Sequence, residues 1–139
     1  MIFETHAHYD DEAFNGDRDE LLRSMKENGI ETIVNVGASF RGVEDTVKLM
    51  EQYSFVYGAV GIHPDEVGDL DEEKMEILCR YCHLPKTVAV GEIGLDYYWD
   101  KENHDTQKKW FVRQMDLAKE TDLPIIVHSR DAAKDTLEL

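Results

Sequence analysis

Residues 87–97 read Thr-Val-Ala-Val-Gly-Glu-Ile-Gly-Leu-Asp-Tyr, and this stretch decides the fold. Residues 87–91 are almost continuously apolar, which is typical of a strand that other layers of the protein cover on both faces. Glu92 follows at once, with Gly91 and Gly94 on either side of it. The sequence therefore predicts a parallel sheet covered by helices, with a carboxylate at the end of one strand.

Similar strand patterns recur along the chain and alternate with helical ones. One helix is expected over residues 17–28, where Asp17 and Glu20 form a capping pair and Gly29 ends the helix. Strict alternation of strands and helices predicts that the strands are parallel. The expected strands are residues 2–5, 32–36, 55–62, 87–91 and 124–128, and the expected helices are residues 17–28, 43–50, 75–82, 110–121 and a fifth from residue 131.

Two architectures fit this alternation, an open doubly wound sheet and a TIM-type (β/α) barrel. Both place their chemistry at the carboxyl ends of the strands, but an open sheet concentrates it at one switch point, whereas a barrel gathers loops from all its strands. Polar candidates follow four different strands: His6 and His8, His63, Glu92 and His128. We therefore expect an α/β fold of the barrel class, in which residues 1–139 form a single domain with about the first five β/α units.

The charge of the chain excludes some classes of function. The 139 residues include 30 acidic and 15 basic ones, which give a formal net charge of −15. This charge opposes non-specific adhesion to nucleic acid or an anionic membrane, but bound divalent cations would reverse the local potential in a nuclease site. The start of the chain lacks a secretory signal and no stretch reaches transmembrane length, so we expect a cytoplasmic protein without a membrane partner.

Cys79 and Cys82 form a single C-x-x-C pattern, which occurs in redox and zinc sites. Here the two cysteines share a helical spacing with Met75 and Leu78, at i, i+3, i+4 and i+7. There is no second cysteine pair, and free cysteine is commonly buried. We therefore expect both to be core residues of a helix.

Four residues are candidate metal ligands: His6, His8, Glu92 and His128. His6 and His8 alternate along the first strand, so their imidazoles point to the same side, about 6.6 Å apart along the strand. Glu92 needs a neutralising partner, either an arginine or a metal ion, and a metal ion would explain the adjacent glycines as room for a ligand. Imidazole and carboxylate suit hydrolytic metal centres, and a carboxylate can bridge two ions.

Three further features lie close to these candidates. His63 follows the third strand and is a candidate catalytic or substrate-binding residue, or else a simple turn residue. Arg130 is a candidate phosphate clamp, with a surface pair to Asp131 or Asp135 as the alternative. The aromatic residues 97–99 could stack on unpaired bases, although we expect them to pack beneath their loop.

Four motifs together resemble the TatD family of metal-dependent deoxyribonucleases, within the wider amidohydrolase-like barrels. The strings GEIGLDY and PxxxHxRxA are specific, whereas the opening His-x-His is shared with many metallohydrolases. The motifs are Phe3–Asp10, Gly61–Pro64, Gly91–Tyr97 and Pro124–Ala132, so the resemblance spans nearly the whole chain.

The resemblance implies roles for five residues. His6 and His8 would ligate one ion, a bridging and catalytic Glu92 would ligate two, His128 would hold the second, and His63 would face the substrate. Two of the family's ligands, a His after the sixth strand and an Asp after the eighth, would lie beyond the end of this sequence.

The sequence also departs from the family pattern in two places. Glu4 stands where the family usually has Asp, and Lys134 stands where it commonly has an acid.

The expected function is that of a deoxyribonuclease that uses two divalent metal ions, Mg, Mn or Zn, to activate the water that cleaves DNA. The alternatives are a metallohydrolase of a small ester, lactone or amide, and a non-catalytic half-barrel. If the natural chain were no longer than 139 residues, its first and fifth strands would be open edges. We would then expect an oligomer or an aggregate.

Overall fold

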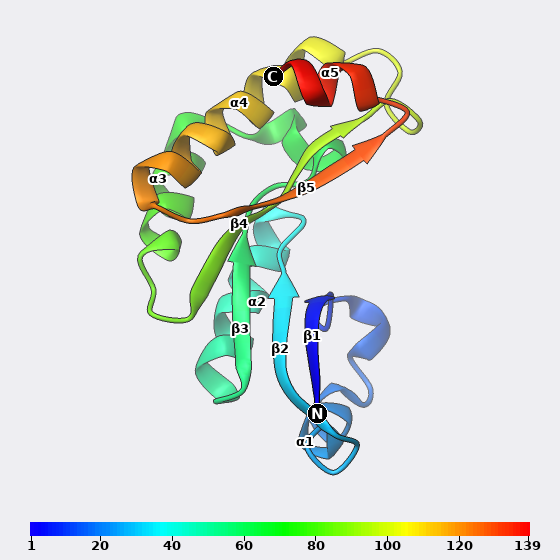
Figure 1. Cartoon of the computed structure of the whole chain (residues 1–139), viewed down its shortest axis with the longest axis vertical. Helices are drawn as coiled ribbons and strands as arrows, with labels where there is room; N and C mark the ends of the chain where they lie inside the picture. Colours follow the sequence, from blue (N-terminus) through cyan, green and yellow to red (C-terminus); the bar gives the residue numbers. More distant parts are fainter.

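The computed structural model describes all of residues 1–139, and it consists of a curved parallel sheet with helices packed against it (Figure 1). The strands are β1 (Ile2–Ala7), β2 (Ile30–Val36), β3 (Val56–Val60), β4 (Thr87–Asp96) and β5 (Ile125–Arg130). The α-helices are α1 (Arg18–Ser24), α2 (Phe40–Gln52), α3 (Glu72–Cys82), α4 (His104–Thr121) and α5 (Ala133–Glu138), and two 3-10 helices are η1 (Glu12–Phe14) and η2 (Pro64–Asp69).

The strand order identifies the architecture. The sheet runs β1-β2-β3-β4-β5, and each strand is parallel to the next. A doubly wound sheet would reverse its order at a switch point, whereas a sequential order with right-handed crossovers keeps every helix on one face. Figure 1 shows the sheet twisting continuously, so that β5 runs obliquely to β1. The prediction of five β/α units of a barrel is confirmed.

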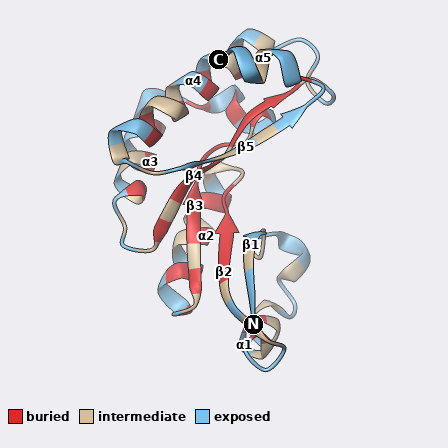
Figure 2. Ribbon diagram, viewed as in Figure 1, coloured by how far each residue is buried: buried red, intermediate tan, exposed pale blue.

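The main core lies between the middle of the sheet and helices α3 and α4. Val60 and Val90 are fully buried there against Leu78, Trp110 and Leu117. Each large apolar side chain buried in this way contributes about 1.5–3 kcal/mol. In Figure 2 the buried residues concentrate on β2, β3 and β4, while the outer strands are mostly exposed.

The two cysteines are core residues of α3, as the helical spacing predicts. Cys82 is 5% exposed, and Cys79 packs against the same core. Burial raises the pKa of the Cys82 thiol to about 12. Because a reactive cysteine needs an accessible thiolate, this pair has a packing role.

The first helix is shorter than the sequence predicts. α1 ends at Ser24, and the side chain of Asp17, its N-cap residue, makes no capping hydrogen bond. The expected capping pair with Glu20 is therefore wrong, because the Asp17 backbone (φ −142°, ψ 2°) departs from the extended conformation of an N-cap. Gly29 does end the turn that follows, with a left-handed φ of +79°.

The last two strands are longer than expected, and this changes the position of two site residues. Glu92 and His128 lie inside β4 and β5, so the prediction that they stand at strand ends is wrong. The reason is that the two strands continue to pair beyond them, with Gly94 opposite His128. The backbone N–H of Glu92 donates to the carbonyl of Gly37, directly after β2 (2.9 Å). Glu92 is therefore level with the carboxyl end of β2.

The edge strands carry exposed apolar side chains. Phe3 on β1 is 62% exposed, and Ile125 and Val127 on β5 are 41% and 42% exposed. Association through these edges stays a prediction, which light scattering on the 139-residue chain would test. None of the helices combines the length and the apolar character needed to cross a membrane.

Candidate metal centre

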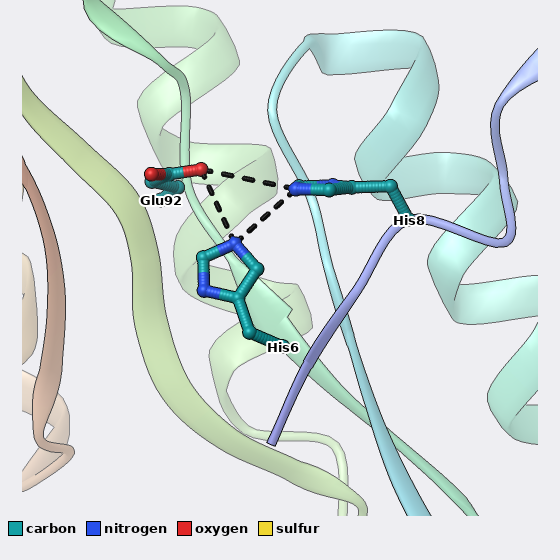
Figure 3. A group of neighbouring side chains, drawn as sticks. All are labelled: His6, His8 and Glu92. Atoms are coloured by element: carbon teal, nitrogen blue, oxygen red, sulfur yellow. Dashed lines mark hydrogen bonds and ion pairs between the residues drawn. The ribbon is translucent and has the colours of Figure 1, made fainter. Parts of the chain in front are cut away.

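Three of the candidate ligands converge at the carboxyl end of the sheet (Figure 3). The Nε2 atoms of His6 and His8 lie 3.2 Å apart, and they are 3.4 Å and 3.9 Å from Oε2 of Glu92. For a tetrahedral ion with bonds of about 2.1 Å, two ligand nitrogens would be about 3.4 Å apart. These spacings therefore fit a cation held by two imidazoles and a carboxylate.

The orientation of His8 prepares it for ligation. Its Nδ1–H donates to the carbonyl oxygen of Val36 at 2.8 Å, which leaves the Nε2 lone pair directed at the cluster. Metal-binding histidines commonly donate their second ring N–H in this way. The backbone at the carboxyl end of β2 thus fixes the tautomer of His8.

The other carboxylate oxygen of Glu92 faces a different histidine. Oε1 lies 3.2 Å from Nδ1 of His128, on the neighbouring strand β5. His6 and His8 lie on the side of Oε2, so the two oxygens of Glu92 face two separate groups. A carboxylate between two groups of this kind has the geometry of a bridge between two ions.

Asp96 is a site residue that we did not single out from the sequence. It is 1% exposed, and its Oδ2 lies 2.8 Å from Nε2 of His128. Burial works to raise the pKa of Asp96, but hydrogen bonds from the Trp99 N–H and from His128 lower it, so this carboxyl group is an anion. The Nε2 of His128 therefore carries the proton, and in the neutral ring Nδ1 offers its lone pair toward Glu92. The feature of the sequence that could have indicated Asp96 is its position directly after the apolar Leu95.

We expect Asp96→Asn to weaken metal binding by about 10- to 100-fold while the fold is retained. The carbonyl oxygen of the new side chain can still accept from the backbone, but its amide then faces His128 and favours the tautomer with the proton on Nδ1. Titration calorimetry with Mn²⁺ measures the change. Asp100→Asn is the matched control. Asp100 lies in the same loop, but its carboxylate accepts the backbone N–H of Asn103 and makes no hydrogen bond to a histidine. Equal affinities of the two variants would contradict this role for Asp96.

His63 lies beside the same cluster, at the start of η2. Its Nδ1 accepts the backbone N–H of Asp65 at 3.2 Å. Its ring packs edge to face against the ring of His128, with the two ring centroids 4.2 Å apart. Burial and the neighbouring His128 lower the pKa of His63, so the ring is neutral and its proton is on Nε2. Donor atoms of His63, Glu92 and His128 lie within 4.8 Å of one another.

Two buried glutamines of α4 hold the backbone next to these residues. The side chain of Gln114 accepts the N–H of Ile62 and donates to its carbonyl (2.7 and 3.1 Å), one residue before His63. Gln107 makes the same pair of bonds with Asp96 (2.9 and 3.0 Å). We did not assign these residues a role from the sequence. Two glutamines seven positions apart on a helix do not indicate which distant backbone groups their side chains bind.

A third buried amide holds the loop after His8. Asn35 is fully buried on β2, where its Oδ1 accepts the N–H of Tyr9 and its NH₂ donates to Asp10 and Thr46. The signal was a polar residue within the apolar run that begins at Ile33, between Val34 and Val36. A buried amide must find hydrogen-bond partners, and here two of those partners, Tyr9 and Asp10, belong to the loop that follows β1.

A cleft of about 770 Å³ opens beside the cluster. His8, His63 and Glu92 line one part of it, and the first turn of α2 lines another with Ser39 and Arg41. Acidic and basic side chains both contribute to its walls, so the cleft is polar without being a basic groove. Its position gives a substrate direct access to Glu92.

Arg130 is the last residue of β5 and does not line this cleft. Its guanidinium carbon sits 4.0 Å above the ring of Tyr98, and Asp135, one of its expected surface partners, pairs with Lys108 instead. The expectation that residues 97–99 pack beneath their loop is correct for Tyr97, which stacks on His104 at 3.6 Å. It is wrong for Tyr98 and Trp99, which are exposed because their loop turns outward after β4.

Comparison with known proteins places this fold and site in a family. The family model described as TatD related DNase matches residues 3–139. The chain is 40% identical to the uncharacterized metal-dependent hydrolase YabD of Bacillus subtilis, over all of this chain and 54% of YabD. It is 29% identical over 119 residues to the 3'-5' ssDNA/RNA exonuclease TatD of Escherichia coli K12, which corresponds to 86% of this chain and 46% of that protein.

A solved structure agrees with both the sequence match and the fold. The crystal structure of YjjV, a TatD homologue from Escherichia coli K12, matches 99% of this chain and 54% of its own with a TM-score of 0.89 and 31% identity. The chain thus spans about half the length of the relatives that it matches. With the family model covering nearly every residue, the chain belongs to the TatD-related DNase family of metal-dependent hydrolases.

Proposed function

We propose that the protein hydrolyses the phosphodiester bonds of DNA with two divalent metal ions, Mg, Mn or Zn. The observation that carries the proposal is the position of Glu92, whose two carboxylate oxygens face separate histidine groups. His6 and His8 would hold one ion with Oε2, and His128 would hold the second with Oε1. When bound, the ions would stabilise charge on the phosphoryl group and activate water at neutral pH.

The residues of this chain would prepare the site for that chemistry. Asp96 and Val36 fix the protons of His128 and His8 on the nitrogens that face away from Glu92. The side chain of Glu92 is only 14% exposed, so its negative charge acts where little water screens it. The ligand nitrogens and the carboxylate therefore already face the places where cations would be held.

His63 would contact the substrate. It lines the cleft, and its neutral ring can donate its Nε2–H to a phosphate oxygen or to the departing oxygen. Because its Nδ1 accepts from the backbone of Asp65, the ring is held in one orientation. This arrangement supports a role in binding or in proton donation.

The choice of DNA as substrate is supported by the nuclease names of the family and of the relative TatD. The net charge of −15 does not oppose it at the site, because two bound cations would reverse the local potential.

The test uses the full-length gene product and an end-labelled oligodeoxynucleotide, with Mg²⁺, Mn²⁺ or Zn²⁺ or with EDTA. We expect cleavage with at least one ion, its loss in EDTA and its recovery when that ion is restored. If no oligonucleotide is cleaved under any of these conditions and a small ester, lactone or amide is hydrolysed instead, the proposed substrate is wrong.

A further inference from the structure

Two exposed aromatic rings and an arginine form a group on the rim of the metal centre, which we call the rim platform. Tyr98 and Trp99 belong to the loop after β4 and are 45% and 66% exposed, and Arg130 ends β5. The two rings meet edge to face at 4.8 Å. The Arg130 guanidinium carbon lies 4.0 Å from the centre of the Tyr98 ring and 5.5 Å from that of Trp99.

The rim platform is tied to the candidate ligands through one carboxylate. Oδ1 of Asp96 accepts the backbone N–H groups of Tyr98 and Trp99 at 2.9 and 3.0 Å, while Oδ2 lies 2.8 Å from Nε2 of His128. Arg130 stands directly opposite Asp96 in the β4–β5 register. The aromatic rings are therefore held in place beside the metal centre by the residue that orients one of its ligands.

The chemistry of the rim platform fits an unpaired nucleobase. Exposed aromatic rings fixed at their backbone stack on bases of any sequence, and a guanidinium beside them attracts the phosphate of the same strand. The guanidinium lies closer to Tyr98 than to Trp99, so Trp99, the more exposed ring, offers the more open surface. In a duplex the faces of the internal bases are occupied by their neighbours, so this surface suits a single strand.

We propose that Tyr98, Trp99 and Arg130 form a base-stacking subsite that binds one unpaired nucleotide of a single-stranded nucleic acid next to the bond that is cut. The base stacks on Trp99, and Arg130, packed on Tyr98, contacts the adjoining phosphate. The proposal rests on the proposed nuclease function, because it places a substrate strand at the metal centre.

The first test measures binding without cleavage, by tryptophan fluorescence of the full-length Glu92→Gln variant with oligothymidylate. Trp99 is exposed and Trp110 is 5% exposed, so we expect the oligonucleotide to quench the emission of Trp99. The quenching should disappear in Glu92→Gln/Trp99→Phe and with a strand of abasic units. Equal quenching with and without Trp99, or none at all, would overturn the subsite.

The second test measures cleavage of the same strands by the protein with Glu92 intact. We expect Trp99→Ala to raise KM for oligothymidylate about 5- to 150-fold, Trp99→Phe to retain most of the affinity, and cleavage of the abasic strand to be the same in all three proteins. Arg130→Gln should raise KM for both strands. Lys109→Ala is the matched control, because Lys109 lies over the ring of Trp110 on α4, and its removal should change neither KM.

The outcomes separate this proposal from the proposed function. If the protein cleaves DNA but Trp99→Ala leaves KM for oligothymidylate unchanged, the subsite is wrong and the nuclease function stands. If no strand is cleaved with any ion while oligothymidylate still quenches Trp99, the subsite stands as a site for single strands and the nuclease function fails.

Discussion

Glu92→Gln is expected to reduce the hydrolysis of DNA by about 1,000-fold or more in the full-length gene product, because the loss of metal stabilisation costs several kcal/mol in the transition state. Glutamine keeps the shape of the side chain but removes its charge. One of its two polar atoms becomes an NH₂ group, which cannot ligate a cation. Whichever way the amide turns, one of the two histidine groups therefore loses its shared ligand.

The measurement is kcat with saturating Mn²⁺, together with circular dichroism to show that the fold is intact. Glu66→Gln is the matched control, because Glu66 lines the same cleft but its carboxylate pairs with no histidine. We expect this control to keep near-normal activity. If Glu92→Gln cleaved DNA nearly as well as the unaltered protein, the two-ion role of Glu92 would be wrong.

Gly94→Ala is expected to destabilise the fold by about 2–6 kcal/mol, the sum of a steric overlap and a strained backbone. A Cβ atom at this position would lie 1.9 Å from the carbonyl oxygen of His128, and the φ of Gly94 is +148°. The overlap involves backbone on both strands, so no side-chain rotation relieves it. Removing it would require β5 to move away from β4 and would take His128 away from Glu92.

Urea denaturation followed by circular dichroism measures this loss of stability. Gly68→Ala provides the comparison, because no atom lies within 4 Å of a Cβ at Gly68, and we expect its stability to change by less than about 1 kcal/mol. If Gly94→Ala unfolded at the same urea concentration as the unaltered protein, the close approach of β4 and β5 at this point would be wrong.

The glycines around Glu92 show where sequence reasoning found the right residues for the wrong reason. Their presence suggested room for a ligand, but a Cβ on Gly91 would meet the side chain of Ile126, and one on Gly94 would meet His128. The space that they leave is filled by β5. A neighbouring strand and a ligand both require a missing Cβ, and the sequence alone cannot distinguish between them.

The convergence of His6, His8, Glu92 and His128 could be predicted because the pattern of each short segment is local. Alternation along a strand sets the side of an imidazole, and parallel strands bring residues from the same part of each strand close together, which holds for Glu92 and His128 although both lie inside their strands. The identity of the partners could not be predicted. Asp96 contacts His128 from 32 positions away, so only the register of β4 on β5 reveals the contact.

The aromatic loop shows the same limit. Tyr97, Tyr98 and Trp99 are consecutive and chemically alike, yet only Tyr97 packs inward, where its hydroxyl donates to Asp135 at 2.7 Å. The hydrogen bonds of Asp96 to the next two backbone N–H groups turn the loop outward at Tyr98. That turn depends on tertiary contacts of Asp96, which composition and periodicity do not contain.

The central claim is that Glu92 joins two metal sites, and the most direct test is anomalous diffraction from crystals of the full-length gene product soaked in Mn²⁺. The account predicts two anomalous peaks, each about 2.0–2.2 Å from an oxygen of Glu92. One peak should contact His6 and His8, and the other should contact Nδ1 of His128. A single peak away from Glu92, or Mn²⁺ bound only to surface carboxylates, would contradict the account.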